Sequence, residues 1–281
     1  IPSGTVSYSA SSYGSVDTGS SLTYSHTVAD EDNRLLLVGV SIFSNSIAVS
    51  SITYNGDAMT LVARDPNSAA DNAVEMWKLV APDVGAHDVV VTMAGSILYG
   101  FTSAALSFYD VDQDAPLGTA TTAEAATTSI STAPAAGGVG DLVVDFMAGS
   151  AVGGVVATVG AGQTQRVNAQ NGIEVIIGAS TEPGIDGNVT MSWSFNKSEY
   201  ATIAAVAVKP ADITPTISNV ASDPADHTAV ITWDTDIGAD SQVFYGLTAA
   251  YGSNTTLDSN LVTSHSQTIV GLLANTTYHY K

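Results

Sequence analysis

Cysteine is absent from this 281-residue sequence, so no disulfide framework, thiol nucleophile or covalent haem attachment is available. Basic residues are scarce as well: seven Lys and Arg stand against 27 Asp and Glu, a formal net charge of −20. Such a chain repels nucleic-acid phosphates and anionic membrane surfaces. Divalent cations and uncharged polymers such as polysaccharide remain as candidate partners.

Charged residues of either sign make up only 12% of the chain, about half of the usual share. Two runs, 89–109 and 146–165, carry no charge at all. Aspartates rather than basic residues flank the first run, and glycines interrupt the second, which disfavours membrane spans. Each run instead predicts two strands around a turn. We therefore expect a protein without a membrane span.

The stretch 51–118 indicates an all-β fold. Three apolar runs alternate there with turn residues at 54–57, 65–68 and 81–85. Asn55-Gly56 between alternating runs is the strongest short-range hairpin signal, because both positions tolerate positive φ. Turn signals that recur roughly every ten residues are typical of sandwiches and barrels. We predict strands at 51–54, 58–64, 73–80, 87–94, 98–109, 126–132, 140–148, 155–159, 163–168, 172–180, 187–196 and 199–209.

Three other segments carry specific expectations. The run 34–40 is apolar on both faces beyond Arg34, which predicts a strand buried between two layers. Residues 120–127 are the one place where a short helix is plausible, and a loop fits equally well. Residues 1–25 have two interpretations. We favour an ordinary first strand over an extension that pairs with the sheet edge of a neighbouring subunit.

A short stiff linker is predicted at 210–215, where Pro210 and Pro215 follow a closing strand. It separates a large domain at 1–209 from a smaller one at 216–281. The large domain resembles the jelly-roll-like modules of secreted bacterial surface proteins, through the phrases at 54–56, 75–79, 82–85 and 107–113. That resemblance implies a large β-sandwich and carries no catalytic residue.

Residues 216–281 resemble a fibronectin type III module. Trp233 ends the second expected strand, and Gly271-Leu272 followed by Thr277-Tyr278-His279-Tyr280 is similar to the turn that leads into the sixth strand of that family. The resemblance implies a second β-sandwich without catalytic residues. The sequence reaches Lys281 inside the sixth strand, so we expect the last strand to be missing. Such a module has an open sheet edge, which proteins ordinarily cover.

An acidic turn is the one candidate metal site. Asp110, Asp112 and Asp114 alternate along the chain, and several carboxylates presented from one loop suit Ca²⁺. The glycine and distal glutamate of an EF-hand are missing, and a solvated acidic turn is the alternative. Residues 30–33 form a second acidic turn of the same kind. Bound Ca²⁺ would hold loops together rather than take part in catalysis.

No catalytic constellation is found. Glu75 and Glu174 lie in apolar strands, where either one could be a buried carboxylate with a raised pKa, but we expect outward-facing side chains. The five histidines are scattered without zinc-binding spacing, and no serine lies in a G-x-S-x-G elbow. The sequence therefore predicts a protein that is not an enzyme.

Aromatic residues and possible N-glycosylation sites are the remaining candidate functional residues. Trp193 and Trp233 lie on apolar faces and are expected in the core, and Trp77 is ambiguous. A platform for stacking on sugars could be built from Tyr8, Tyr13, Tyr24, Trp77, Tyr99 and Tyr109. Four N-x-S/T sites allow glycosylation if the host performs it: Asn188, Asn196, Asn254 and Asn275.

Taken together, these features predict a secreted protein at the cell surface or outside the cell, with its signal peptide removed. We expect a structural or adhesive role, as a surface-fibre subunit that contacts other copies of itself or surface proteins by strand addition. The alternative is a carbohydrate-binding accessory module of a larger secreted hydrolase.

Overall fold

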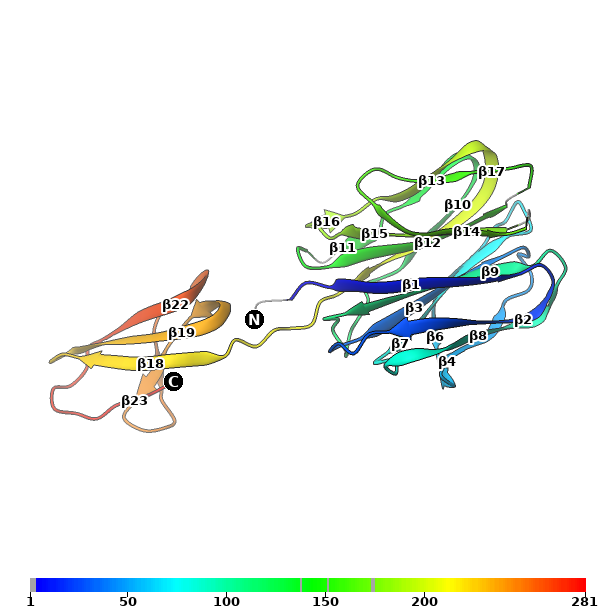
Figure 1. Cartoon of the computed structure of the whole chain (residues 1–281). Coiled ribbons are helices and arrows are strands. Elements are labelled where there is room, and N and C mark those ends of the chain that lie inside the picture. Colours follow the sequence, from blue (N-terminus) through cyan, green and yellow to red (C-terminus); the bar gives the residue numbers. More distant parts are fainter. Residues whose placement is uncertain (1–3, 137, 151, 173–174) are drawn as a thin grey trace. The chain divides into compact units, whose positions relative to one another are not determined.

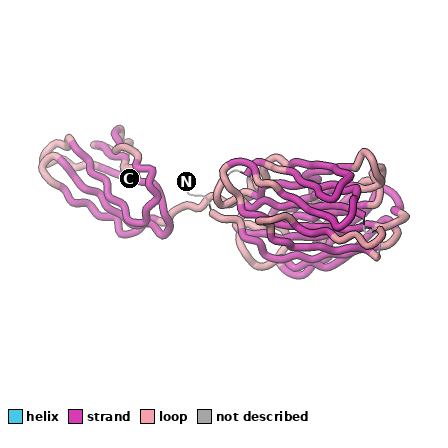
Figure 2. The backbone as a smooth tube through the Cα atoms, turned by 90° about the horizontal axis from the view of Figure 1, so that it is seen from above, coloured by secondary structure: helices cyan, strands magenta, loops and turns pink. Residues whose placement is uncertain are grey.

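The computed structural model describes residues 4–136, 138–150, 152–172 and 175–281. These residues form strands, turns and loops without a helix (Figure 2), so the prediction of an all-β protein is confirmed. Accordingly, no helix long and apolar enough to cross a membrane exists in the described chain. The chain divides into two compact units, Gly4–Ala211 and Asp212–Lys281, which are coloured in sequence order in Figure 1.

Two antiparallel sheets make up the first half of the larger unit. The central sheet has the order β1-β9-β3-β7-β6, and the second sheet has the order β2-β8-β4-β5. The strands are β1 (Ser7–Val16), β2 (Gly19–Val28), β3 (Leu35–Ile42), β4 (Val49–Tyr54), β5 (Asp57–Ala58), β6 (Thr60–Pro66), β7 (Ala73–Val80), β8 (Gly85–Ile97) and β9 (Phe101–Tyr109).

The second half of the larger unit repeats the strand order of the central sheet. Its main sheet, called the third sheet below, has the order β10-β17-β12-β15-β14, with β13 beside β17, and β11 pairs with β16. In the order in which they lie in the sheet, β10, β17, β12, β15 and β14 correspond to β1, β9, β3, β7 and β6. The strands are β10 (Thr121–Thr132), β11 (Ala135–Ala136), β12 (Leu142–Ser150), β13 (Ala157–Val159), β14 (Thr164–Asn171), β15 (Val175–Pro183), β16 (Gly187–Asn188) and β17 (Met191–Val208).

The central sheet is buried on both faces. Leu35 and Leu37 of β3 pack in one core with Phe146 of the third sheet, whereas Leu36 and Val38 pack in another core with the second sheet. All eight residues of β3 are buried, which confirms the prediction of a strand between two layers. A third core lies on the outer face of the third sheet, around Met147, Met191 and Trp193. Ala136 of β11, Ala157 of β13 and Val189, which follows β16, belong to the same core.

Two expectations about strand boundaries are wrong. Of residues 120–127, predicted as a helix or loop, all from Thr121 onward belong to β10, because pairing with β17 from Thr121 to Thr132 imposes an extended backbone. The two strands predicted at 187–196 and 199–209 are largely one strand, β17, preceded by the short β16. Of residues 1–25, Ser7–Val16 forms β1 in the sheet of its own chain, as the first interpretation expects, and residues 1–3 lie outside the described residues.

The smaller unit contains two three-stranded sheets, with the orders β18-β19-β22 and β21-β20-β23. Its buried core is small: Ala229, Ile231, Val243 and Ile269, with Trp233, Tyr245 and Leu272 packed against them. The strands are β18 (Ile217–Pro224), β19 (Thr228–Ser241), β20 (Phe244–Gly246), β21 (Ser253–Asn254), β22 (Asp258–Val270) and β23 (His279–Tyr280).

The contact between Gly39 and Phe146 reports how closely the central and third sheets pack. A Cβ atom on Gly39 would lie 2.0 Å from a Phe146 ring carbon, so Gly39→Ala forces the two sheets or the ring to move. We expect a loss of about 1–3 kcal/mol in the free energy of unfolding, measured by denaturant titration. The double variant Gly39→Ala/Phe146→Leu should be less destabilised than the sum of its single changes.

The matched control is Gly95→Ala in β8, where the new Cβ would meet its nearest neighbour, Ile47, at an ordinary 3.6 Å. Its stability should stay within about 0.5 kcal/mol of the unmodified protein. Equal losses for Gly39→Ala and Gly95→Ala would contradict the close contact between the sheets.

Candidate functional site

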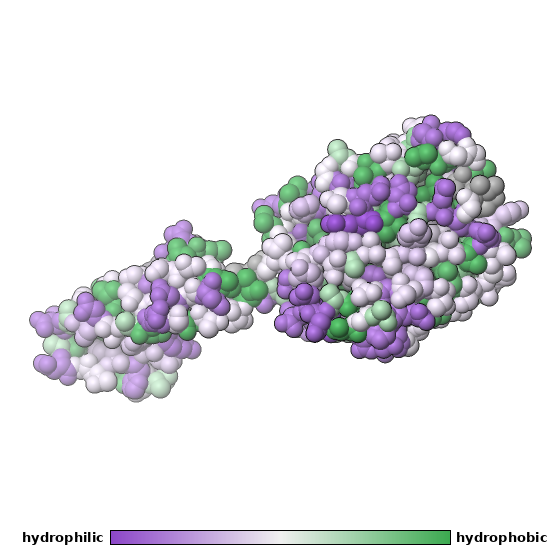
Figure 3. Space-filling view, viewed as in Figure 1, coloured by the Kyte–Doolittle hydropathy of each residue, from purple (hydrophilic) through white to green (hydrophobic). Residues whose placement is uncertain are grey.

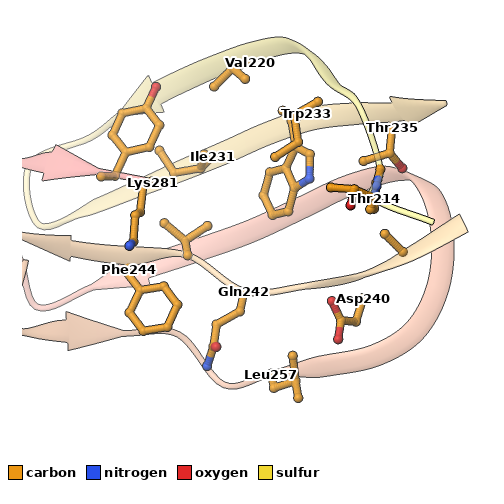
Figure 4. A pocket seen from close by; sticks show the side chains of 15 residues that line it. Thr214, Val220, Ile231, Trp233, Thr235, Asp240, Gln242, Phe244, Leu257 and Lys281 are labelled. Carbon is orange, nitrogen blue, oxygen red and sulfur yellow. The ribbon is translucent and has the colours of Figure 1, made fainter. Parts of the chain in front are cut away.

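An apolar groove opens between the two sheets of the smaller unit. Its volume is about 750 Å³, and Val220, Ile231 and Trp233 of β18 and β19 line it together with Phe244 and Leu257 (Figure 4). Several of these side chains are strongly exposed for apolar groups: Ile217 at 62%, Val220 at 54% and Leu257 at 51%. An exposed apolar surface of this kind is a candidate interaction site.

Unpaired strand edges border this groove. Among the described residues, β18 pairs only with β19, and β23 pairs only with β20. Both β18 and β23 contribute side chains to the groove, Ile217 and Tyr280 among them. Each strand therefore presents free backbone N–H and C=O groups along its outer edge. A further strand laid beside either edge would gain backbone hydrogen bonds and bury apolar side chains in the groove.

The ring of Trp233 is held in place by stacking on a buried histidine. Its ring stacks on the buried His265 imidazole, with ring centroids 4.9 Å apart and an interplanar angle of 1°. His265 is itself fixed, because Nδ1 lies 2.7 Å from the Ser241 hydroxyl and Nε2 lies 2.9 Å from the Thr235 hydroxyl. Trp233 is only partly buried, so the prediction that it belongs to the core is correct for one of its faces.

Charge is sparse around the groove. Asp240 and Lys281 contribute to its lining (Figure 4). The Lys281 ammonium lies 5.2 Å from the centre of the Tyr251 ring and 5.5 Å from that of Phe244, within the range of cation–π contact. Figure 3 shows apolar side chains among the hydrophilic ones on the surfaces of both units.

The predicted calcium ligands lie in a loop that is held by hydrogen bonds. Asp112 Oδ1 accepts hydrogen bonds from the Asp114 N–H at 2.9 Å and the Ala115 N–H at 3.1 Å. The Asp110 N–H donates to the carbonyl of Asp32, at 3.1 Å. Within the described residues, no three metal-binding side chains converge in a group that could hold an ion. Binding of Ca²⁺ by Asp110, Asp112 and Asp114 stays a prediction.

Glu75 points into the protein, so the expectation of an outward-facing side chain is wrong. The residue is 1% exposed, and its carboxylate accepts bonds from Arg64 Nε at 3.0 Å, Trp77 Nε1 at 2.9 Å and the Val49 N–H at 3.1 Å. The same contacts place Trp77 in the core. Glu75 thus ties β4, β6 and β7 together. Glu174 lies outside the described residues.

Asp145 is a buried carboxylate that the sequence analysis missed. It accepts hydrogen bonds from the Ser180 N–H at 2.8 Å, the Ser180 hydroxyl at 2.9 Å, Trp193 Nε1 at 2.9 Å and Gln163 Nε2 at 3.3 Å. All four donors are neutral. Desolvation raises the pKa of Asp145 to about 7, although these hydrogen bonds oppose the shift. Its position inside the apolar run 142–148 was the available signal.

The six aromatic residues proposed for sugar stacking do not form a platform on one sheet face. Only Tyr13 and Tyr99 of the set are more than half exposed, at 58% and 53%. Tyr13 lies in β1, and Tyr99 lies in the connection between β8 and β9. The Tyr24 hydroxyl lies 2.9 Å from that of Ser103, and Tyr8 packs edge-on against Phe108. Trp193, 1% exposed, is in the core as predicted.

The four possible glycosylation sites are all exposed: Asn188, Asn196, Asn254 and Asn275. Their modification stays a prediction. Comparison with models of known protein families and with curated proteins finds no match for this sequence.

Asp145 makes stability depend on pH in a defined direction. Its pKa is raised from an ordinary 3.8 to about 7, so the folded state holds a proton that the unfolded state has lost between these values. Its contribution to stability is complete below about pH 4 and declines as pH rises to about 7, by at most about 1.4 kcal/mol per pH unit. Asp145→Asn should abolish this decline in denaturant titrations across that window.

His26 makes stability change with pH in the opposite direction. Burial lowers its pKa to about 4, so its contribution to stability grows as pH rises through the acidic range. The measured quantity is therefore the difference between Asp145→Asn and the unmodified protein at each pH. A difference that does not change between pH 4 and pH 7 would contradict a protonated Asp145 in the folded protein.

Proposed function

We propose that this is a secreted, non-enzymatic structural or adhesive protein of the cell surface, which associates with further copies of itself by strand addition. The observation that carries the proposal is the apolar groove of the smaller unit, bordered by the unpaired edges of β18 and β23. In strand addition, main-chain hydrogen bonds supply affinity and pockets for alternate side chains supply specificity. The strand edges offer the main-chain hydrogen bonds, and the groove offers the pockets for side chains.

The strand orders support the two family resemblances. In the smaller unit, the first, second and fifth strands form one sheet, and the third and sixth belong to the other, as in immunoglobulin-like sandwiches. In the larger unit, β1-β9-β3-β7 facing β2-β8-β4-β5 supports a jelly-roll-like module. Modules of both kinds suit an extracellular structural role, and the scarcity of charge in the sequence is compatible with it.

The non-enzymatic part of the proposal rests on how the carboxylates are used. Glu75 is occupied by Arg64, Trp77 and the Val49 N–H. Asp145 is occupied by Ser180, Trp193 and Gln163. Both side chains therefore serve as internal hydrogen-bond acceptors. Within the described residues, none of the hydrogen-bond partners of these two side chains is a second carboxylate, which acid–base hydrolysis of glycosides requires nearby.

We propose that the occupant of the groove is an edge strand from the smaller unit of a second copy. Each copy carries a formal charge of −20, so electrostatic repulsion opposes this contact at low ionic strength. The contact itself is apolar. Association should therefore strengthen with added salt, which screens the repulsion while leaving the burial of Ile217, Val220 and Phe244 in place. Strand β1 is a poor donor, because it is paired with β9 in its own chain.

Val220→Lys tests the groove directly. Val220 lines the groove and is 54% exposed, so lysine is tolerated by the free protein and opposes the apolar contact. We expect at least about tenfold weaker self-association, a loss of about 1.4 kcal/mol, in sedimentation velocity over a concentration series. Negative-stain electron microscopy would show whether the associated species are filaments.

The matched control is Val270→Lys in β22 of the same sheet, at a residue that is 64% exposed and does not line the groove. It should associate like the unmodified protein. A protein that is monomeric at every concentration and salt level refutes self-assembly. Self-association that Val220→Lys and Val270→Lys weaken equally refutes the groove as the contact.

A further inference from the structure

A second cleft lies in the larger unit, where three loops meet. They are the connections β3–β4, β6–β7 and β8–β9, and Asn45 Nδ2 of the first donates to the carbonyl of Asn67 in the second at 3.3 Å. The Phe43 ring meets the Tyr99 ring of the third loop edge-on, with centroids 5.2 Å apart. The cleft has a volume of about 250 Å³. We call it the loop cleft, lined among others by Phe43, Ser44, Ser46, Asp71, Ser96 and Tyr99.

The lining of the loop cleft combines an aromatic ring with hydroxyl groups. Tyr99 is 53% exposed, and Phe43 holds it edge-on, which leaves part of its ring to solvent. Ser46, Ser96 and Asp71 are exposed as well, and they offer hydroxyl and carboxylate oxygens. No lysine or arginine is among the residues that line the cleft, all of which belong to the described chain. This composition disfavours anionic ligands such as phosphate or sulfate esters.

The β8–β9 loop is fixed by a residue from the other half of the unit. Asn171 is 1% exposed, and its Nδ2 donates to the carbonyl of Tyr99 at 3.2 Å and to that of Val16 at 3.1 Å. Its Oδ1 accepts the Val175 N–H at 2.7 Å. The adjacent Gly100 has a φ of +76°, and a Cβ there would lie 2.0 Å from the Val16 carbonyl oxygen. The backbone that carries Tyr99 is therefore held in one conformation.

The β6–β7 loop is fixed in a similar way. Asn67 is 2% exposed, and its Oδ1 accepts the N–H groups of Ala69 and Ala70 at 2.9 and 3.1 Å. Its Nδ2 donates to the carbonyl of Ala201 in β17 at 3.4 Å. Asn72, 4% exposed, donates through Nδ2 to the carbonyl of Tyr200 at 2.6 Å. Buried side chains thus hold two of the three loops before any ligand arrives, which lowers the entropic cost of binding.

We infer that the loop cleft binds a neutral saccharide. A sugar ring has an apolar C–H face that can pack on the Tyr99 ring and a rim of hydroxyls that can bond to Ser46, Ser96 and Asp71. A metal ion would find one carboxylate where it needs several oxygens. A wholly apolar ligand would leave the hydroxyls and the carboxylate unsatisfied. This binding site lies in the larger unit and is independent of strand addition in the smaller one.

The test begins with a glycan array of neutral, unsulfated oligosaccharides, probed with the full chain. The strongest binder is then titrated by isothermal calorimetry. Tyr99→Ala removes the ring and should weaken binding at least about tenfold, whereas Tyr99→Phe keeps the ring and should stay within about threefold. Asp71→Asn should weaken binding by a smaller factor. Thermal unfolding of each variant shows whether the fold is retained.

Tyr13→Ala is the matched control, because Tyr13 is equally exposed, at 58%, but lies in β1 away from the loop cleft. It should bind like the unmodified protein. The inference is overturned if no neutral glycan binds, if only sulfated or sialylated glycans bind, or if Tyr99→Ala binds as tightly as the unmodified protein. It is also overturned if Tyr13→Ala and Tyr99→Ala lose the same affinity.

Discussion

Burial of the central sheet on both of its faces is the constraint on which the larger unit depends. Strand β3 has no exposed residue, so it needs a sheet on each side. The second sheet covers one face and the third sheet covers the other. Gly39, the fifth residue of β3, leaves the space that Phe146, the fifth residue of β12, occupies. The two halves of the unit share one strand order. At corresponding positions of β3 and β12, the space beside Gly39 fits the ring of Phe146.

The smaller unit shows the opposite situation. Its sheets face one another over a small core around Ile231, Val243 and Ile269, and Trp233 borders an open groove with one face stacked on His265. Apolar side chains that the larger unit would bury are exposed here, between two unpaired strand edges. A structure of this kind gains stability from any strand that covers it. The same apolar effect that closes the larger unit is the basis of the proposal that the smaller unit accepts a strand from a partner.

The two proposed sites have different physical origins. The groove exists because strand edges are unpaired, and its chemistry is apolar and backbone-directed. The loop cleft exists because buried asparagines hold loops in fixed conformations, and its chemistry is that of one aromatic ring among hydroxyls. Assembly is the role proposed for the groove, and saccharide binding is the role inferred for the loop cleft.

Composition and alternation were sufficient to predict the all-β class, the two-sided burial of 34–40 and the core position of Trp193, because these follow from local pattern. Pairing partners decided the rest. Residues 121–127 form a strand through pairing with β17, and Glu75 points inward because Arg64, Trp77 and the Val49 N–H meet its carboxylate there. Asp145, the groove and the loop cleft each unite residues distant in sequence, as Asn171 and Tyr99 are. No local pattern encodes such contacts, because the folded chain alone brings those residues together.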